Sequence, residues 1–182
     1  DAASGEKLFA WPAHTTRINA LAFSPDGTRL VTASDDYKAR VWDILDAKNP
    51  HLLTTLELSA EIKSIAFRAD GKLLLLGLNN GIARVRDLST ETDVATLRGH
   101  TDTITSVAFS PNGESIATAS LDGTAKVWDP KTGKELFTLS GHTNAVTKIA
   151  FSPDGKRIAT VGRDGAAKLW NVETGQEELT LP

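Results

Sequence analysis

The sequence lacks several residue types, and each absence excludes a class of site or compartment. It has no cysteine among 182 residues, so disulfides, thiolate zinc sites and cysteine nucleophiles are excluded. No apolar run is longer than that of residues 73–76, which is far shorter than the roughly 20 residues of a membrane helix. The N-terminus also lacks the pattern of a signal peptide. We therefore expect a protein of a reducing compartment, the cytoplasm, with no membrane association.

Methionine is also absent, including at position 1, which indicates a chain that was processed, excised from a longer one or designed. The sequence also has no excess of positive charge, since it contains 20 basic and 23 acidic side chains. The resulting net charge of -3 gives no general attraction to nucleic acid. The sequence contains no GxGxxG motif and no P-loop, so no phosphate-binding cofactor is predicted.

What the sequence does contain is a repeat. A phrase of the type Phe-Ser-Pro-Asp-Gly occurs four times, at steps of 44, 42 and 42 residues. A unit of this size cannot bury its own apolar face, so neighbouring units must stack to form a continuous core. The four copies occupy residues 23–27, 67–71, 109–113 and 151–155.

Each unit has the pattern of four short antiparallel strands. In the third unit, alternating residues 104–109 precede a turn, and residues 115–120, 124–128 and 135–139 follow, separated by tight turns. Four strands per unit of this length predict an all-β propeller blade, with a β-sandwich as the structural alternative.

At this point the chain resembles the WD40 repeat β-propellers over essentially its whole length. Gly99-His100 and Gly141-His142 open units, and Trp128-Asp129 closes a third strand. His14, His100 and His142 each precede a tryptophan by 28 residues, and an aspartate stands six residues before each of those tryptophans. The third and fourth units, which are nearly identical, look like propellers of bacterial multidomain proteins.

The resemblance implies a structural tetrad of His, Ser, Asp and Trp joined by hydrogen bonds in each blade. Two copies are complete and the fourth unit has Gly162 in place of serine, which predicts a network shorter by one link. The predicted members are His14, Ser34, Asp36 and Trp42; His100, Ser120, Asp122 and Trp128; and His142, Asp164 and Trp170.

The second unit departs from the pattern, with Leu58, Leu78, Asn80 and Arg86 at the four positions. We expect packing alone to hold this blade, and its amide hydrogens to exchange fastest.

A catalytic triad is the other interpretation of Ser, His and Asp together. A nucleophile is needed once, whereas this constellation recurs with a tryptophan attached, so we predict no enzyme. The histidines stand 42 or more residues apart at equivalent positions, apart from His51, so no metal site is predicted.

A basic residue stands two positions before each tryptophan position, at Arg40, Arg84, Lys126 and Lys168. A ring of such residues is typical either of a polyanion site or of scaffold side chains with packed stems, and we favour the scaffold.

Partner specificity must lie where the copies differ at exposed positions. The resemblance points to the start of each first strand and to the residue before each tetrad aspartate. We call this set the candidate face: Arg17, Asn19, Asp35, Glu61, Lys63, Asn79, Thr103, Thr105, Leu121, Ala145, Thr147 and Arg163. Trp11 is a further aromatic, interpreted as blade packing or as a contact residue.

The predicted organisation is an outer strand of a preceding blade over residues 1–13, then blades over 14–57, 58–99, 100–141 and 142–182. The chain thus contains one outer strand more than a closed four-bladed ring needs. We therefore predict a stretch of a seven- or eight-bladed propeller, whose exposed blade ends can associate. The predicted function is a protein- or peptide-binding scaffold, a signalling module of a larger protein. The alternatives are a nucleic-acid or polyanion binder, and a designed or excised fragment without a function of its own.

Overall fold

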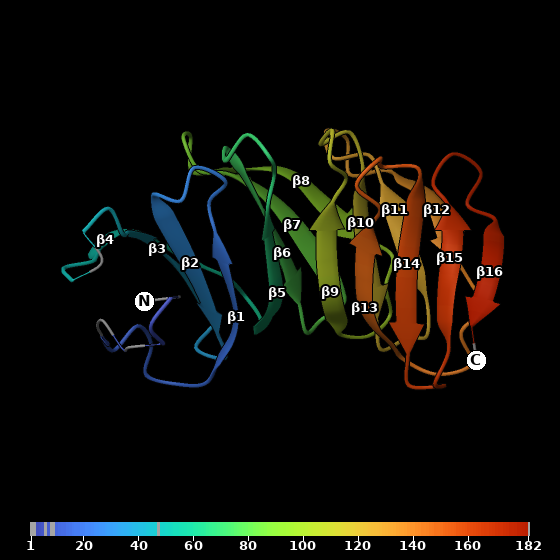
Figure 1. The fold of residues 1–182 in the computed structure, drawn as a ribbon, viewed down its shortest axis with the longest axis horizontal. Helices are drawn as coiled ribbons and strands as arrows, with labels where there is room; N and C mark the ends of the chain where they lie inside the picture. Colours follow the sequence, from blue (N-terminus) through green and yellow to red (C-terminus); the bar gives the residue numbers. More distant parts are fainter. Residues whose placement is uncertain (1–2, 6, 8–9, 47, 182) are drawn as a thin grey trace.

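The computed structural model describes all residues except 1–2, 6, 8–9, 47 and 182, and the described residues form sixteen strands and no helix (Figure 1). The strands are β1 (Ile18–Phe23), β2 (Arg29–Ser34), β3 (Lys38–Asp43), β4 (His51–Glu57), β5 (Ile62–Phe67), β6 (Leu73–Leu78), β7 (Ile82–Asp87), β8 (Thr92–Arg98), β9 (Ile104–Phe109), β10 (Ile116–Ser120), β11 (Ala125–Trp128), β12 (Glu135–Leu139), β13 (Val146–Phe151), β14 (Arg157–Gly162), β15 (Ala167–Asn171) and β16 (Glu177–Leu181).

These strands form four separate antiparallel sheets, each made of four strands consecutive in the chain. We number the sheets as blades 1 to 4: β1–β4, β5–β8, β9–β12 and β13–β16. The predicted all-β fold of four-stranded blades is confirmed as a partial β-propeller.

The recurring phrase forms the turn between the first two strands of a blade. In blade 1 the carboxylate of Asp26 accepts hydrogen bonds from the Ser24 hydroxyl and the Thr28 amide, and Gly27 has a φ of 70°. A left-handed φ favours glycine because a Cβ would clash there. The phrase therefore belongs to the frame of the molecule.

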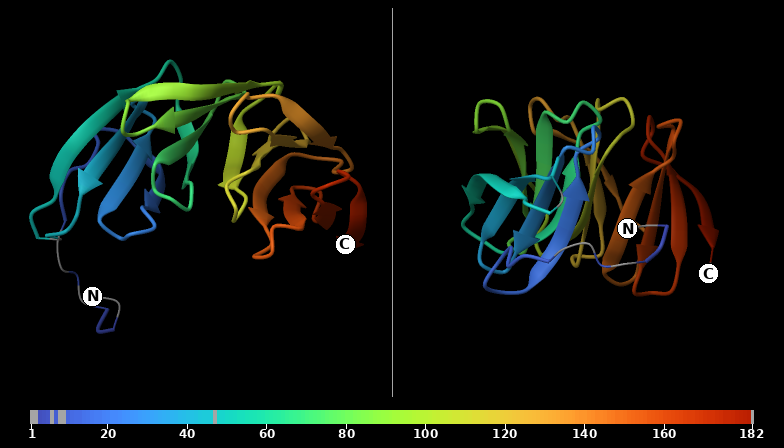
Figure 2. Two further views of the ribbon diagram at one scale, coloured as in Figure 1. Left: turned by 90° about the horizontal axis from the view of Figure 1, so that it is seen from above. Right: turned by 60° about the vertical axis from the view of Figure 1, so that its left-hand side comes forward.

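The four blades are arranged as an open arc (Figure 2). Contacts between successive blades join their first strands: β1 contacts β5, β5 contacts β9, and β9 contacts β13. Each blade–blade junction encloses its own hydrophobic cluster. The core is thus divided between the junctions, as expected for a stacked array.

Blade 2 has the most apolar central strand. All six residues of β6 are buried, because blade 1 covers one face of this sheet and blade 3 covers the other. A strand buried on both faces has no polar side, which explains the continuous leucine run.

Of the predicted outer strand over residues 1–13, residues 1–2, 6 and 8–9 lie outside the described residues. Residues 3–5, 7 and 10–13, which the structure describes, form no strand. In the described part of the chain, no helix is long and apolar enough to cross a membrane.

Gly77 in β6 marks the closest approach between blades 2 and 3. A Cβ at this position would lie 2.7 Å from Ile104 Cγ2 and 2.8 Å from Val107 Cγ1. Blades 1 and 3 carry Ala33 and Ala119 at the equivalent position, so each of the three blades that a following blade covers has a small residue here.

We expect Gly77→Val to lower the free energy of unfolding by about 1–3 kcal/mol, because the added methyl groups overpack this junction. Gly77→Ala, which only reproduces the alanines of the neighbouring blades, is expected to cost less. Urea denaturation measures both, and equal stability of Gly77→Val and the wild type would contradict the packing described.

Candidate functional site

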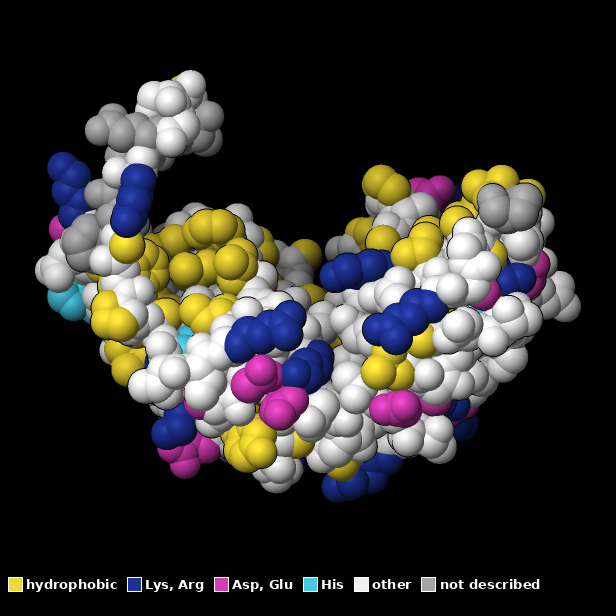
Figure 3. Space-filling model, turned by 90° about the horizontal axis from the view of Figure 1, so that it is seen from below, with side chains coloured by type: hydrophobic (Ala, Val, Ile, Leu, Met, Phe, Trp, Pro, Cys, Tyr) yellow, Lys and Arg dark blue, Asp and Glu magenta, His cyan; other side chains and the backbone are white. Residues whose placement is uncertain are grey.

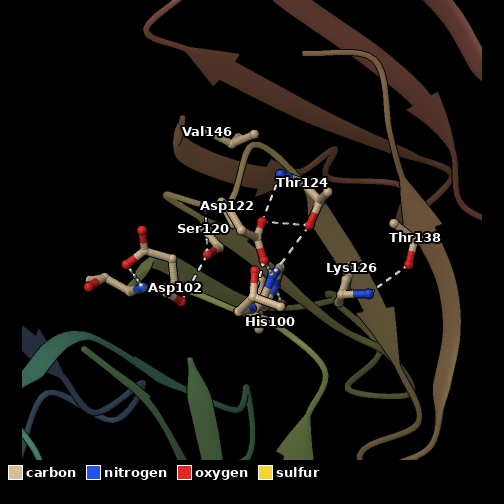
Figure 4. Close-up of polar contacts among 12 residues, drawn as sticks. His100, Asp102, Ser120, Asp122, Thr124, Lys126, Thr138 and Val146 are labelled. Atoms are coloured by element: carbon tan, nitrogen blue, oxygen red, sulfur yellow. Dashed lines mark hydrogen bonds and ion pairs between the residues drawn. The ribbon is translucent and has the colours of Figure 1, made fainter. Parts of the chain in front are cut away.

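Blade 3 contains a buried chain of hydrogen bonds that runs from a tryptophan to an aspartate. Trp128 Nε1–H donates to Thr118 Oγ1 at 2.8 Å, and Thr118 Oγ1 lies 2.8 Å from His100 Nε2. Because the Asp122 carboxylate can only accept, Nδ1 carries the proton of the neutral imidazole, and Nε2 therefore accepts the proton of the Thr118 hydroxyl. His100 Nδ1 then donates to Asp122 Oδ2 at 2.8 Å (Figure 4).

The same chain occurs in blades 1 and 4. In blade 1, Trp42 donates to Thr32 at 3.0 Å, and His14 lies 2.8 Å from Thr32 and 3.0 Å from Asp36 Oδ2. In blade 4 the corresponding distances are 2.9, 2.9 and 2.8 Å, through Thr160, His142 and Asp164. The network is therefore complete in three blades.

The prediction that serine is the linking residue is wrong. Ser120 Oγ instead accepts the amide of Asp122 and donates to the carbonyl of Asp102 (Figure 4), and Ser34 Oγ accepts the amide of Asp36. These serines stabilise the turn that carries the aspartate, while a threonine two residues earlier makes the link.

The prediction of a shortened network in blade 4 is wrong for the same reason, because Thr160 makes the link there. A Cβ on Gly162 would lie 2.6 Å from both His142 Nδ1 and Asp164 Oδ1, so glycine leaves room for the histidine–aspartate pair. A signal in the sequence could have identified the threonine: it occurs in the three units that keep His, Asp and Trp, and the second unit has Leu76 instead.

The network favours an ionised aspartate beside a neutral histidine. Burial raises the pKa of Asp36, but hydrogen bonds from His14 and Arg40 outweigh it and lower that pKa to about 2. Desolvation lowers the pKa of His100, although its hydrogen bond to Asp122 acts in the opposite direction. The lowered pKa favours the neutral imidazole. The side chains of His14 and His100 have no solvent-accessible surface, so a substrate has no access to these two imidazoles.

In blade 2 the network is replaced by leucines and an ion-pair cluster. Leu76 and Leu78 are fully buried, and Leu58 packs against the cluster between blades 1 and 2. The expectation that packing alone holds this blade is wrong, because Arg84 and Arg86 both bind the carboxylate of Asp93, at 2.7 and 3.2 Å.

The four basic residues before the tryptophan positions are all paired within their own blades. Arg40 contacts Asp36, and Arg84 contacts Asp93. Lys126 and Lys168 bind Glu135 and Glu177, at 2.9 and 3.0 Å, and each also reaches a threonine hydroxyl of the outer strand. This arrangement matches the scaffold interpretation.

The structure brings the members of the candidate face together in pairs. In every blade, the residue before the tetrad position donates its amide to the carbonyl of the residue at the start of the first strand. These pairs are Asp35 with Arg17, Asn79 with Glu61, Leu121 with Thr103, and Arg163 with Ala145, at distances of 2.8–3.0 Å.

Several side chains of the candidate face are used between blades. Lys63 binds Asp35 of blade 1 at 2.8 Å and Glu61 of its own blade at 2.7 Å. Asn19 donates to Asp35 and to the Ile62 carbonyl.

The threonines continue this pattern across the later blades. Thr103 and Thr105 donate to the carbonyls of Asn79 and Val146 in the adjacent blades, and Thr147 donates to Val161 within blade 4. Thr103 and Thr105 thus link blade 3 to the blades on either side of it.

A hollow of about 280 Å³ lies between blades 3 and 4, where Leu121 and Ala145 of the candidate face line its wall. Residues 122–124 and 140–144 form the rest of the lining. Among the described residues, no group of three or more His, Asp and Glu side chains is placed to hold a metal ion.

Trp11 packs against Trp42 of blade 1 in an edge-on arrangement, with ring centroids 5.9 Å apart. This contact supports the interpretation of Trp11 as a packing residue, because edge-to-face aromatic pairs stabilise a junction.

Residues 18–181 match the family described as "Echinoderm microtubule-associated protein second beta-propeller". The chain belongs to this β-propeller family. The resemblance to WD40 propellers is thereby confirmed at the level of the family.

Two relatives are about 30% identical to this chain over slightly more than half of its length. The pre-mRNA-splicing factor cwf17 of Schizosaccharomyces pombe is 30% identical over 106 residues, 58% of this chain and 30% of that protein. The serine-threonine kinase receptor-associated protein of Gallus gallus is 29% identical over 102 residues, 56% of this chain and 28% of that protein. The matched region spans less than a third of each relative.

We expect Thr118→Val to lower the free energy of unfolding by about 1–3 kcal/mol, because the isosteric change leaves the indole N–H and the imidazole Nε2 buried without partners. Thr118→Ser, which keeps the hydroxyl, is the matched control and is expected to cost less. Thermal or urea denaturation measures both, and a Thr118→Val variant as stable as the wild type would show that the network carries no stability.

Proposed function

We propose that this propeller segment is a non-enzymatic scaffold that binds a protein or peptide partner on the candidate face, at the hollow between blades 3 and 4. The observation that supports this site is the position of Leu121, a partly exposed apolar side chain in the wall of that hollow. Concave sites with an apolar contact and nearby polar backbone groups are typical of binding sites. The blade 1–2 part of the face offers fewer free groups to a partner, because Lys63 is paired with Asp35 and Glu61.

The repeated hydrogen-bond network argues against catalysis. Three equivalent copies exist, each threonine hydroxyl is held between an indole and an imidazole, and the histidines are buried. A hydroxyl committed to two partners is poorly placed to attack a substrate. The network is better explained as part of the frame.

A polyanion-binding function is disfavoured by the pairing of Arg40, Arg84, Lys126 and Lys168 with carboxylates of their own blades. Nucleic-acid binding gains free energy when unpaired cationic side chains displace counterions from the phosphates. These four side chains are already paired with carboxylates.

We also propose that the chain is a segment of a closed propeller ring of seven or eight blades. The exposed apolar side chains on the two end sheets of the arc support this, since the same positions are buried at the junctions inside the chain. On the sequence alone, we further propose that the ring acts in the cytoplasm as a signalling module of a larger multidomain protein, with repeats of the bacterial type.

Selection from a library of displayed peptides tests the binding site. We expect peptides enriched on the wild type to lose at least tenfold in affinity, about 1.4 kcal/mol, on the Leu121→Asp variant, because a carboxylate replaces the apolar wall of the hollow. Affinity is measured by isothermal titration with the enriched peptides.

The matched control is Leu136→Asp, which makes the same change on the outer strand β12, where Leu136 is exposed away from the hollow. Retained binding by Leu136→Asp is expected. Peptides that bind Leu121→Asp as tightly as the wild type would place the partner site elsewhere.

A further inference from the structure

Blade 2 holds two arginines against a single aspartate. Arg84 and Arg86 stand two positions apart on β7, so their side chains lie on the same face of the sheet. Their Nη1 atoms lie 2.7 and 3.2 Å from the two carboxylate oxygens of Asp93 on β8. Among the described residues, no other carboxylate forms an ion pair with either guanidinium. The cluster therefore carries one positive charge that no carboxylate balances.

The other three blades have no such excess of charge. At the position of Arg84, each of them places one basic side chain against one carboxylate. These pairs are Arg40 with Asp36, Lys126 with Glu135, and Lys168 with Glu177. At the position of Arg86 they carry uncharged tryptophans: Trp42, Trp128 and Trp170. Arg86 is thus the additional charge, and it has no role in the tryptophan network, which blade 2 lacks.

Both guanidinium groups keep donors that no described residue uses. The Nε–H groups of Arg84 and Arg86 are buried and have no hydrogen-bond partner in the described part of the chain. Their Nη2 groups also have no partner among those residues, and they reach solvent, since the two side chains are 29% and 26% exposed. A partly buried cation without a full set of hydrogen bonds costs free energy. An anion at the Nη2 groups would recover part of this cost.

Thr96 adds a hydroxyl beside the two arginines. It stands opposite Arg84 in the register of β7 and β8. In blade 3 the equivalent hydroxyl, that of Thr138, accepts from Lys126 at 2.7 Å. The Thr96 hydroxyl makes no hydrogen bond to any residue that the structure describes. A hydroxyl can donate to an anion, so Thr96 offers a further donor on this face.

The cluster lies on the outer side of the molecule. β8 is the outermost strand of blade 2 and runs along the convex side of the arc (Figure 2). Figure 3 shows hydrophobic side chains gathered at the two ends of the arc, whereas the cluster lies in the second of the four blades. Its exposure is therefore independent of the uncovered ends, and it is separate from the hollow between blades 3 and 4.

We propose that Arg84, Arg86 and Thr96 form a binding site for one carboxylate, supplied by an aspartate or glutamate side chain of a protein partner. The planar N–H fork of a guanidinium matches the two oxygens of a carboxylate. One carboxylate balances the single positive charge that Asp93 leaves. A phosphoryl group, which carries nearly two negative charges at neutral pH, would exceed it and repel Asp93.

Titration followed by NMR tests this site on the 182-residue chain, because it detects weak binding at individual residues. The probe is a short, end-blocked peptide with one glutamate between glycines, and the same peptide with glutamine is its control, both at constant ionic strength. We expect the glutamate peptide to shift the side-chain N–H resonances of Arg84 and Arg86 in a saturable manner. The glutamine peptide is expected to cause no such shift.

Substitutions in the cluster are expected to change the affinity for the glutamate peptide in opposite directions. Arg86→Gln is expected to weaken binding at least about tenfold, because a charged hydrogen-bond donor is lost. Asp93→Asn is expected to strengthen binding at least about threefold, because both arginines then lack a carboxylate. Arg157→Gln is the matched control, since Arg157 pairs with the single carboxylate of Glu178 at 2.7 Å, and it is expected to leave the affinity unchanged.

Arg84→Gln is a second variant with the same expected loss as Arg86→Gln, and the backbone amide spectrum of each variant shows whether it folds. Equal shifts with the glutamine peptide, unchanged affinity in both arginine variants, or weaker binding by Asp93→Asn would overturn the proposal. Tighter binding of inorganic phosphate than of the glutamate peptide would assign the site to phosphoryl groups and also overturn it. Peptide binding at Leu121 is measured separately, so these outcomes leave the proposed scaffold function untouched.

Discussion

The constraint on which the rest of this structure depends is that each four-stranded sheet is apolar on both faces and stable only when a neighbouring sheet covers them. The three junctions satisfy this requirement with one recurring arrangement, a small residue on one blade against branched side chains on the next. Blade 2, covered on both sides, carries a fully buried leucine strand. At the two ends of the open arc, one apolar face of the sheet is not covered by another blade.

The buried Trp–Thr–His–Asp chain has a different role, because the fold tolerates its loss. Three blades contain it, and blade 2 replaces it with leucines beside an arginine–aspartate cluster. Replacing a satisfied polar network by packed apolar side chains is often neutral for stability, whereas removing one member leaves the others unpaired. The network therefore fixes the tryptophan strand against the turn that carries the aspartate, while packing between blades supplies the cohesion.

The sequence was sufficient to predict the fold, because the repeated turn phrase and the 28-residue spacing from histidine to tryptophan recur along the chain. It did not separate Thr118 from Ser120. Both residues lie on β10 two positions apart, so their side chains point to the same face, and only the distance along the strand decides which one reaches Trp128. The pairing of Arg84 and Arg86 with Asp93 was missed because it depends on the register between β7 and β8.

Native-state hydrogen exchange tests most directly whether coverage by neighbouring blades determines stability. The comparison is between β6, which is covered on both faces but lacks the network in its blade, and β14, whose blade has the network but one open face. The account predicts slower exchange of the β6 amides, which reverses the expectation drawn from the sequence. Faster exchange in β6 than in β14 would contradict it.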